Sequence, residues 1–129
     1  MKKITPHLWF DKEAKESAEF YVSIFPDSKI KKHSLIKGTP SGDCDIMSYE
    51  LSGQPFMSIS AGPYFKINPA VSFMLNFDPS RDTNAKENLT KLWRKLSESG
   101  KVIMPLQEYP FSKWYGWAED KYGVSWQLI

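Results

Sequence analysis

The chain has 129 residues, a formal net charge of +2, and hydrophobic and aromatic fractions of 41% and 15%. This length fits one domain, or two half-size motifs that share a core, and the aromatic content excludes a disordered chain. The basic residues are dispersed, and only Lys29, Lys31 and Lys32 cluster. A nucleic-acid-binding surface is more basic and more one-sided, so we expect no nucleic-acid partner.

The sequence also argues against export and against a membrane anchor. Residues 1–6 hold two lysines but no long apolar run after them, so we expect no signal peptide. No stretch approaches the roughly 18 apolar residues of a membrane helix. Cys44 is the only cysteine, which rules out an internal disulfide. We therefore expect a cytoplasmic protein.

The first half of the chain predicts one strand, one helix and three further strands. A strand over 4–10 is followed by a helix that Asp11 can cap and that Pro26 ends. Alternating side chains then predict strands at 29–36, 45–51 and 55–60. Residues 37–43 are rich in Gly, Pro and Ser or Thr and are predicted to be a loop or a hairpin tip. Residues 61–69 hold two prolines and a glycine and are predicted to be a loop.

The second half repeats this order. A strand over 71–77 precedes a helix at about 83–99, where Gly100 marks the end. The apolar stripe of this helix is predicted to be Ala85, Leu89, Leu92, Trp93 and Leu96. Short strands at 101–106, 113–118 and 124–129 complete the chain. We predict an α+β fold, a single domain over 1–129 with one βαβββ module at about 1–62 and a second at about 69–129.

Two local matches support a duplicated motif. The Leu-x-Phe-Asp sequence that begins at Leu8 recurs at Leu75, 67 positions later. The segment that begins at Gly53 resembles the segment that begins at Gly123, 70 positions later. Nearly equal offsets at the first and last strands of each half indicate an internal repeat.

Strand alternation assigns the side chains to faces. Leu8 and Phe10 share an apolar face, which we expect to pack on a helix, and the opposite, mixed face is expected to line a cleft. The same reasoning places the second module's mixed residues in a cleft. The predicted ligand-binding residues are Thr5, His7, Trp9, Met57, Ser72, Met74, Asn76 and Gln127.

Four segments carry a family resemblance, at residues 4–11, 20–28, 53–57 and 120–127. Together they resemble the vicinal oxygen chelate superfamily of glyoxalases, extradiol dioxygenases and fosfomycin- and bleomycin-resistance proteins, and most closely its PhnB-like branch. The resemblance implies paired βαβββ modules, a curved mixed sheet around a cleft, and usually a homodimer. Some members of the branch carry a demethylubiquinone methyltransferase label, but this sequence has no strand, Gly-rich turn and helix to hold a methyl donor.

The resemblance also bears on metal binding. Catalytic relatives hold one divalent ion with three or four His, Glu or Gln side chains from the first and last strands of each module, and the ion polarises substrate oxygens. The matching positions here are Thr5, Met57, Ser72 and Gln127. Hydroxyls are weak ligands, a thioether is too soft for Mg, Mn or Zn, and the Gln127 amide is neutral. We predict no metal site and no cofactor.

His7 leaves an alternative open. It lies on the same face as Thr5, and an imidazole can exchange a proton near neutral pH, so His7 is the candidate general base or a displaced ligand beside Gln127. It can equally be a histidine of the cleft wall. His33, on the lysine-rich strand, is predicted to be solvated. Trp9 can stack on a ligand or pack, whereas Trp114 and Trp117 are predicted to pack.

These observations favour two functions and leave a third open. The first is a metal-independent homodimeric binding protein of the resistance-protein kind that holds an apolar small molecule in its cleft. The second is a lyase, isomerase or dioxygenase-type enzyme that uses a non-standard divalent metal site or His7 as general base. The third is a partner-binding module with a vestigial cleft. The sequence does not specify the ligand.

Overall fold

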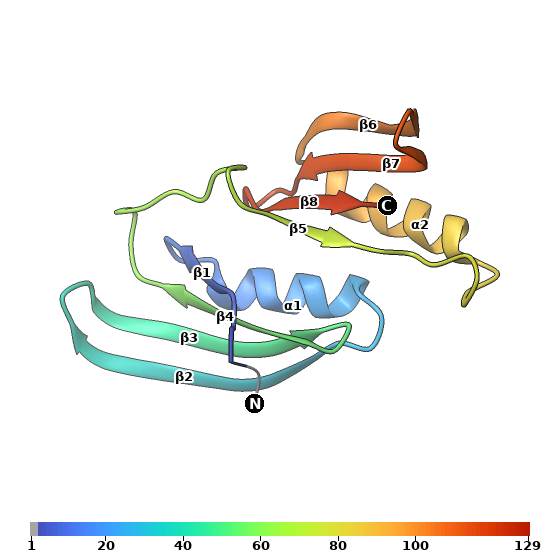
Figure 1. The fold of residues 1–129 in the computed structure, drawn as a ribbon. Helices are drawn as coiled ribbons and strands as arrows, with labels where there is room; N and C mark the ends of the chain where they lie inside the picture. Colours follow the sequence, from blue (N-terminus) through green and yellow to red (C-terminus); the bar gives the residue numbers. More distant parts are fainter. Residues whose placement is uncertain (1–2) are drawn as a thin grey trace. The chain divides into compact units, whose positions relative to one another are not determined.

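The computed structural model describes residues 3–129, and the chain divides into two compact units, residues 1–67 and 68–129. We call these units module one and module two (Figure 1). Met1 and Lys2, part of the N-terminal segment considered above, lie outside the described residues. Each module has the predicted β-α-β-β-β order. The elements are β1 (His7–Phe10), α1 (Ala14–Ile24), β2 (Lys29–Thr39), β3 (Gly42–Leu51), β4 (Gln54–Ser60), β5 (Ser72–Leu75), α2 (Ala85–Ser97), β6 (Lys101–Tyr109), β7 (Ser112–Glu119) and β8 (Ser125–Leu128).

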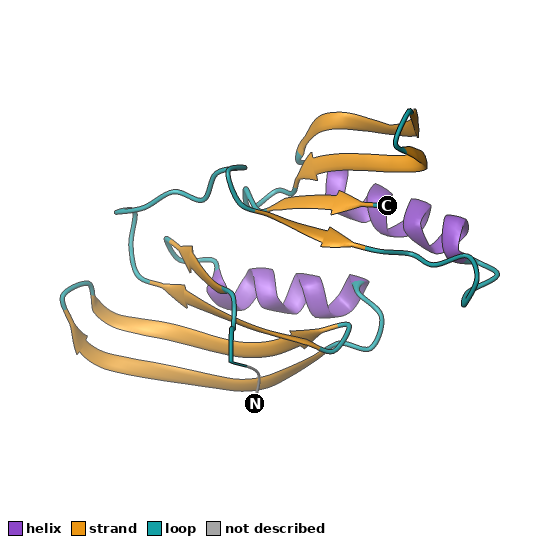
Figure 2. Ribbon diagram, in the orientation of Figure 1, coloured by secondary structure: helices purple, strands orange, loops and turns teal. Residues whose placement is uncertain are grey.

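Module one is a four-stranded mixed sheet covered on one face by α1 (Figure 2). The strand order is β1-β4-β3-β2, with β1 parallel to β4 and the other neighbours antiparallel. Helix α1 contacts β3 and β4. Leu8 and Phe10 are buried, as predicted, and so are Met47, Tyr49 and Phe56. Alternation therefore identified the helix-facing side of this sheet correctly.

Helix α1 is not capped by Asp11, and this prediction was wrong. The helix begins at Ala14, and the residue before it, Glu13, makes no capping hydrogen bond. The Ser60 hydroxyl on β4 instead accepts the Ala14 backbone N–H at 2.9 Å. The cap is thus supplied from across the sheet, by a residue that no local pattern connects to the helix.

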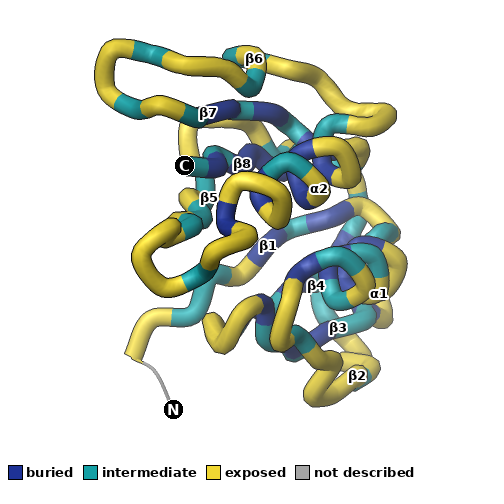
Figure 3. Tube along the Cα trace, turned by 90° about the vertical axis from the view of Figure 1, so that its right-hand side faces the viewer, coloured by how far each residue is buried: buried dark blue, intermediate teal, exposed yellow. Residues whose placement is uncertain are grey.

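The segment 37–43, predicted to be a loop or a hairpin tip, forms the tip of the β2–β3 hairpin. Strand β2 continues to Thr39 and β3 starts at Gly42, so only a tight turn joins them. The Thr39 hydroxyl donates to the Gly42 carbonyl at 2.6 Å, and Gly42 has a φ of 86°, which favours glycine. Strand β2 is an edge strand that is exposed along most of its length (Figure 3), so no buried face marks in the sequence where the strand ends.

Module two repeats the mixed sheet in the order β5-β8-β7-β6, with β5 parallel to β8. Helix α2 contacts β7, and the whole apolar stripe predicted for it is buried. Strand β6 is longer than predicted and contains Pro105, which an edge strand tolerates and which falls among shifts of register. Neither α1 nor α2 combines the length and apolarity that crossing a bilayer requires.

The pairing register reproduces the sequence repeat. In module one, His7 on β1 pairs with Met57 on β4. In module two, Met74 on β5 pairs with Gln127 on β8. These pairs are related by the same offsets, 67 and 70 positions, that the two sequence matches gave. The two modules are therefore duplicates in backbone pairing as well as in sequence.

A buried carboxylate organises the turn before β8. Asp120 is 3% exposed. One of its carboxylate oxygens accepts the backbone N–H groups of Tyr122 and Val124 at 2.8 and 3.1 Å, and the other accepts the Trp126 indole N–H at 2.8 Å. These bonds tie the start of the segment 120–127 to the Trp126 indole near its end.

Candidate functional site

The face of the module one sheet that lies opposite α1 carries His7, Trp9 and Met57. His7 and Met57 are paired in register, and Ser48 on β3 is the next residue across the sheet. Among residues 3–129, no side chain or backbone group hydrogen-bonds to the exposed His7 imidazole. Thr5 lies two residues before the strand and is partly exposed. The structure thus brings His7 and Met57 together but supplies no residue that orients the imidazole.

Trp9 is held by the loop that follows β4. Its indole N–H donates to the Gly62 carbonyl at 2.9 Å, and the Phe65 ring lies edge-on, with centroids 4.9 Å apart. Gly62 has a φ of 94° and its N–H donates to the Asp11 carbonyl. The Trp9 side chain therefore packs within its own module. Stacking of its remaining surface on a ligand stays a prediction.

The equivalent face of module two carries a connected set of polar side chains. The Tyr115 hydroxyl donates to the Gln127 side-chain oxygen at 2.5 Å, and the Gln127 side-chain N–H₂ donates to the Ser72 hydroxyl at 2.7 Å. Met74, beside Gln127, is 48% exposed. Asn76 is exposed and follows the end of β5. Three side chains from three strands are thus joined in one chain of hydrogen bonds.

The Tyr115 hydroxyl was not identified from the sequence as part of this site. Burial raises the pKa of Tyr115, and the nearby Tyr109 raises it further. The phenol therefore keeps its proton well above neutral pH and serves as a donor to Gln127. The signal in the sequence was weak, because only the tertiary pairing of β7 with β8 places residue 115 near residue 127.

Trp114 and Trp117 lie on opposite faces of β7. The Trp114 indole N–H donates to the Thr90 hydroxyl on α2 at 3.1 Å, and the Lys86 ammonium lies 4.5 Å from its ring centroid, so its predicted packing role is confirmed. Trp117 is partly exposed on the face that bears Gln127, where its indole N–H donates to the buried Ser125 hydroxyl at 2.6 Å.

The positions at which catalytic relatives carry metal ligands do not suit a divalent ion. Thr5 and Ser72 offer hydroxyls, and Met57 offers a thioether. The Gln127 amide is the best donor of the four, but its oxygen already accepts from Tyr115 and its nitrogen donates to Ser72. In the described part of the chain, no three His, Cys, Asp or Glu side chains converge. The donor set therefore does not fit the metal of the catalytic relatives.

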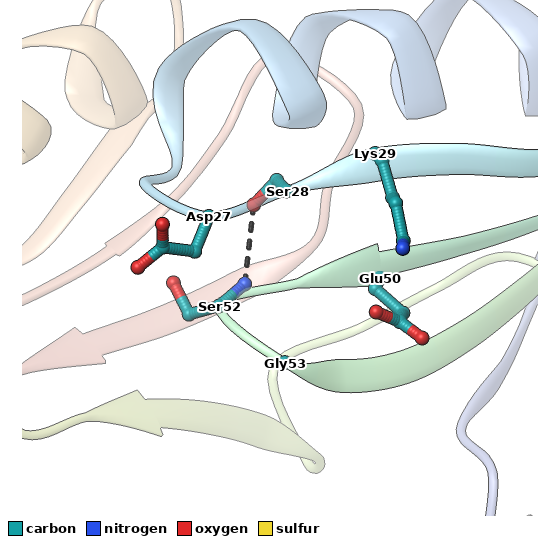
Figure 4. A pocket seen from close by; sticks show the side chains of 6 residues that line it. All are labelled: Asp27, Ser28, Lys29, Glu50, Ser52 and Gly53. Atoms are coloured by element: carbon teal, nitrogen blue, oxygen red, sulfur yellow. Dashed lines mark hydrogen bonds between the residues drawn. The ribbon is translucent and has the colours of Figure 1, made fainter.

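A separate hollow of about 560 Å³ lies where β2 begins, beside the turn between β3 and β4 (Figure 4). Its lining residues are Asp27, Ser28, Lys29, Glu50, Ser52 and Gly53. The Ser52 backbone N–H donates to the Ser28 hydroxyl at 3.1 Å, which ties the two turns together. None of the predicted ligand-binding residues lines this hollow.

Two exposed ion pairs flank module one's hairpin. Lys31 contacts Glu50 at 2.8 Å, and this hydrogen bond lowers the pKa of the Glu50 carboxyl. His33 contacts Asp45 at 2.8 Å with both side chains exposed, as predicted for a solvated histidine. These groups stabilise the hairpin surface only weakly, because solvent screens exposed pairs.

Comparison with known proteins identifies the family. The family model described as 3-demethylubiquinone-9 3-methyltransferase matches residues 2–129. A solved structure from Bacillus cereus, provisionally named 3-demethylubiquinone-9 3-methyltransferase, PhnB protein, is 35% identical over 99% of this chain and 98% of that chain, with a TM-score of 0.85. The chain belongs to this PhnB-like family. The resemblance to the PhnB-like branch of the vicinal oxygen chelate superfamily is confirmed.

More distant structures share the fold. A protein from Pseudomonas aeruginosa is 22% identical over 99% of this chain and 96% of that chain, with a TM-score of 0.80. The fosfomycin resistance protein FosX from Listeria monocytogenes is 9% identical over 99% of this chain and 91% of that chain, with a TM-score of 0.60. No curated protein matches the chain in sequence.

Proposed function

We propose that this PhnB-like chain is a small-molecule binding protein that operates without a metal at the superfamily's ligand positions. The observation that carries the proposal is the Tyr115–Gln127–Ser72 chain, in which two of the four positions bond to each other. A Gln and a Ser that satisfy one another form a polar binding surface. They do not form the open, anionic set that a divalent ion requires.

Methyl transfer, which the family description names, lacks support in this chain. The connections from β1 to α1 and from β5 to α2 span residues 11–13 and 76–84, and neither contains a glycine. A Gly-rich turn between strand and helix, of the kind that brings a cofactor close to the backbone, is thus missing at both places.

Metal analysis combined with thermal unfolding tests the proposal. Untagged protein should carry no stoichiometric divalent ion, and EDTA should leave its melting temperature unchanged. Small apolar ligands found by thermal shift should still bind to the His7→Ala variant, because the His7 side chain makes no hydrogen bond within residues 3–129 and the substitution keeps the backbone pairing of β1 with β4. A stoichiometric ion that EDTA removes, with a fall in melting temperature, would overturn the proposal.

A turnover assay and a mass measurement test catalysis and assembly separately. A turnover that His7→Ala abolishes while ligand binding persists would favour the enzyme with His7 as general base. We also propose a homodimer, since superfamily members often form one, and light scattering after size exclusion should give twice the 14.9 kDa chain mass. A monomeric mass would contradict the dimer without affecting the proposal of metal-free binding.

A further inference from the structure

The Tyr115–Gln127–Ser72 chain has a direction. Tyr115 donates to the Gln127 oxygen, and the Gln127 nitrogen donates to the Ser72 hydroxyl oxygen. A serine hydroxyl has one proton to donate and two lone pairs with which to accept. Ser72 uses a lone pair towards Gln127, so its own proton is directed elsewhere. No acceptor for that proton lies within hydrogen-bond distance among residues 3–129.

The chain should also strengthen Ser72 as a donor. Successive hydrogen bonds polarise one another, by perhaps 10–30% for each bond. Tyr115 is buried and stays protonated, so it donates at all physiological pH values. Each bond withdraws electron density from the acceptor towards the donor, so Ser72, which accepts from Gln127, carries a more acidic proton. Ser72 is only partly buried, so this proton lies on an accessible part of the sheet face.

The surroundings define which acceptor suits this proton. Met74 follows on the same face and is half exposed, and Trp117 pairs with Gln127 from β7. The nearest formal charges in the pairing register are Glu119, opposite Ser125, and Lys101, opposite Glu119. The negative charge of Glu119 disfavours an anionic ligand. A cationic group is itself a hydrogen-bond donor, so it offers no acceptor for the Ser72 proton. An uncharged acceptor beside an apolar body is the best match.

We propose that Ser72 donates a hydrogen bond to the carbonyl oxygen of a neutral, apolar ligand on the module two sheet face, with Gln127 and Tyr115 as positioning residues. This rests on the proposed small-molecule binding function and names the chemical class of its ligand. Module one provides the contrast. The residues that match Ser72 and Gln127 are Thr5 and Met57, and a thioether cannot pass a hydrogen bond on to a hydroxyl in this way.

A pair of isosteric probes tests the proposal. Acetophenone carries a carbonyl oxygen, and α-methylstyrene has the same shape with a CH₂ group in its place. Titration of the isotope-labelled full chain, followed by NMR, should show acetophenone shifting the amide signals of Ser72, Met74 and Gln127. Acetophenone should bind about five- to tenfold more tightly than α-methylstyrene, as expected for one hydrogen bond.

Variants localise the effect. Ser72→Ala should remove the preference for acetophenone and leave α-methylstyrene binding unchanged, whereas Ser72→Thr should restore the preference because it keeps the hydroxyl. Tyr115→Phe should reduce the preference by about twofold, since it interrupts the polarisation but leaves the donor. Thr83→Ala, which removes an exposed hydroxyl outside the strands of module two, is the control and should have no effect. The dispersion of the NMR signals shows that each variant is folded.

The outcomes separate this inference from the broader function. Equal affinities for the two probes, or a preference that survives Ser72→Ala, would overturn the carbonyl inference and leave small-molecule binding intact. No binding of either probe at about 20 mM, well above a dissociation constant on the order of 1 mM, would overturn the inference as well. A stoichiometric metal ion would overturn the proposed function while the ratio of probe affinities still decides the role of Ser72.

Discussion

Module one and module two have the same topology but fill the space between the central strand and the helix differently. In module one the central strand β3 carries large side chains, since Met47 and Tyr49 are buried beneath α1. The corresponding residues on β7, identified by their pairing with β8, are Gly116 and Ala118. Module two therefore has little side-chain volume on its central strand.

The helices compensate for this difference. Helix α1 buries Ala14, Ser17, Ala18 and Tyr21, whereas α2 buries Trp93 together with three leucines and Ala85. A Cβ added at Gly116 would lie 2.6 Å from the Trp93 ring, so the indole occupies the space above the glycine. Protein interiors tolerate many combinations of side chains provided that the total volume is kept. The two modules show two such combinations in one chain.

The turns before the last strands differ as well. In module one a buried Leu51 precedes a two-residue turn in which Ser52 and Gly53 have φ values of 49° and 83°. In module two the equivalent buried position is Asp120, which accepts three hydrogen bonds. One turn is therefore secured by an apolar side chain and backbone geometry, and the other by a carboxylate. Substitutions should separate these mechanisms.

The largest effect is expected for Asp120→Asn. The amide replaces one acceptor oxygen with a donor, so at least one of the three N–H groups loses its partner in a buried site. We expect a loss of roughly 3 kcal/mol in the free energy of unfolding, measured with urea. Asp78→Asn, an exposed change within the same module, is the control and should leave the urea midpoint nearly unchanged. Equal losses in the two variants would contradict the role of Asp120.

Gly116→Ala is expected to have the second-largest effect. It should lower the free energy of unfolding by about 2 kcal/mol, because the added methyl group overpacks against Trp93. Combining it with Trp93→Leu tests the complementarity directly. The smaller leucine leaves room for the added methyl group, so the double variant should be more stable than the sum of the two single losses predicts. Strict additivity in denaturant unfolding would show that the two positions do not share space.

Tyr115→Phe should change stability by about 1 kcal/mol at neutral pH, because Gln127 loses a donor. Its signature is the pH dependence. The pKa of Tyr115 is raised in the folded protein above the ordinary value of 10.0, so its contribution is fully present below that value and is lost as pH rises through the folded pKa. Wild-type stability should therefore fall more steeply than that of Tyr115→Phe above about pH 10. Parallel profiles would contradict this, and Tyr64→Phe at an exposed position controls for loss of a hydroxyl.

The smallest effect is expected for Glu50→Gln in module one. Lys31 lowers the pKa of Glu50, so the pair stabilises the fold above the unfolded carboxyl pKa and ceases to do so as pH falls through the lower folded value. Solvent screens the exposed pair, and the variant should unfold at nearly the wild-type urea concentration, with any difference vanishing in high salt. A large shift that persists in salt would indicate a structural role for Glu50.

Prediction from the sequence succeeded where a pattern was local. The helix stripe of α2 and the buried faces of β1 and β8 follow from side-chain period, because burial of one face imposes that period. It failed at the cap of α1, where Ser60 replaced Asp11, and at the ends of β2. In the first case the capping partner lies on a distant strand, and in the second the strand has no buried face to impose a pattern.

The candidate site shows the same division. Alternation placed Ser72 and Gln127 on one face, and residue chemistry led us to predict no metal site there, which stays a prediction. Alternation could not show that the two side chains bond to each other, or that Tyr115 completes the chain. Those contacts depend on which strands are neighbours and in which register.

By itself, the sequence determined the duplicated βαβββ order, the faces of the strands and the family, since each follows from local periodicity or from sequence motifs. Only the tertiary structure decided that Trp93 fills the space above Gly116, that Asp120 holds Trp126, and that Ser72 is left with a proton to donate. The physical reason is that packing volume and hydrogen-bond satisfaction are properties of residues brought together from distant parts of the chain.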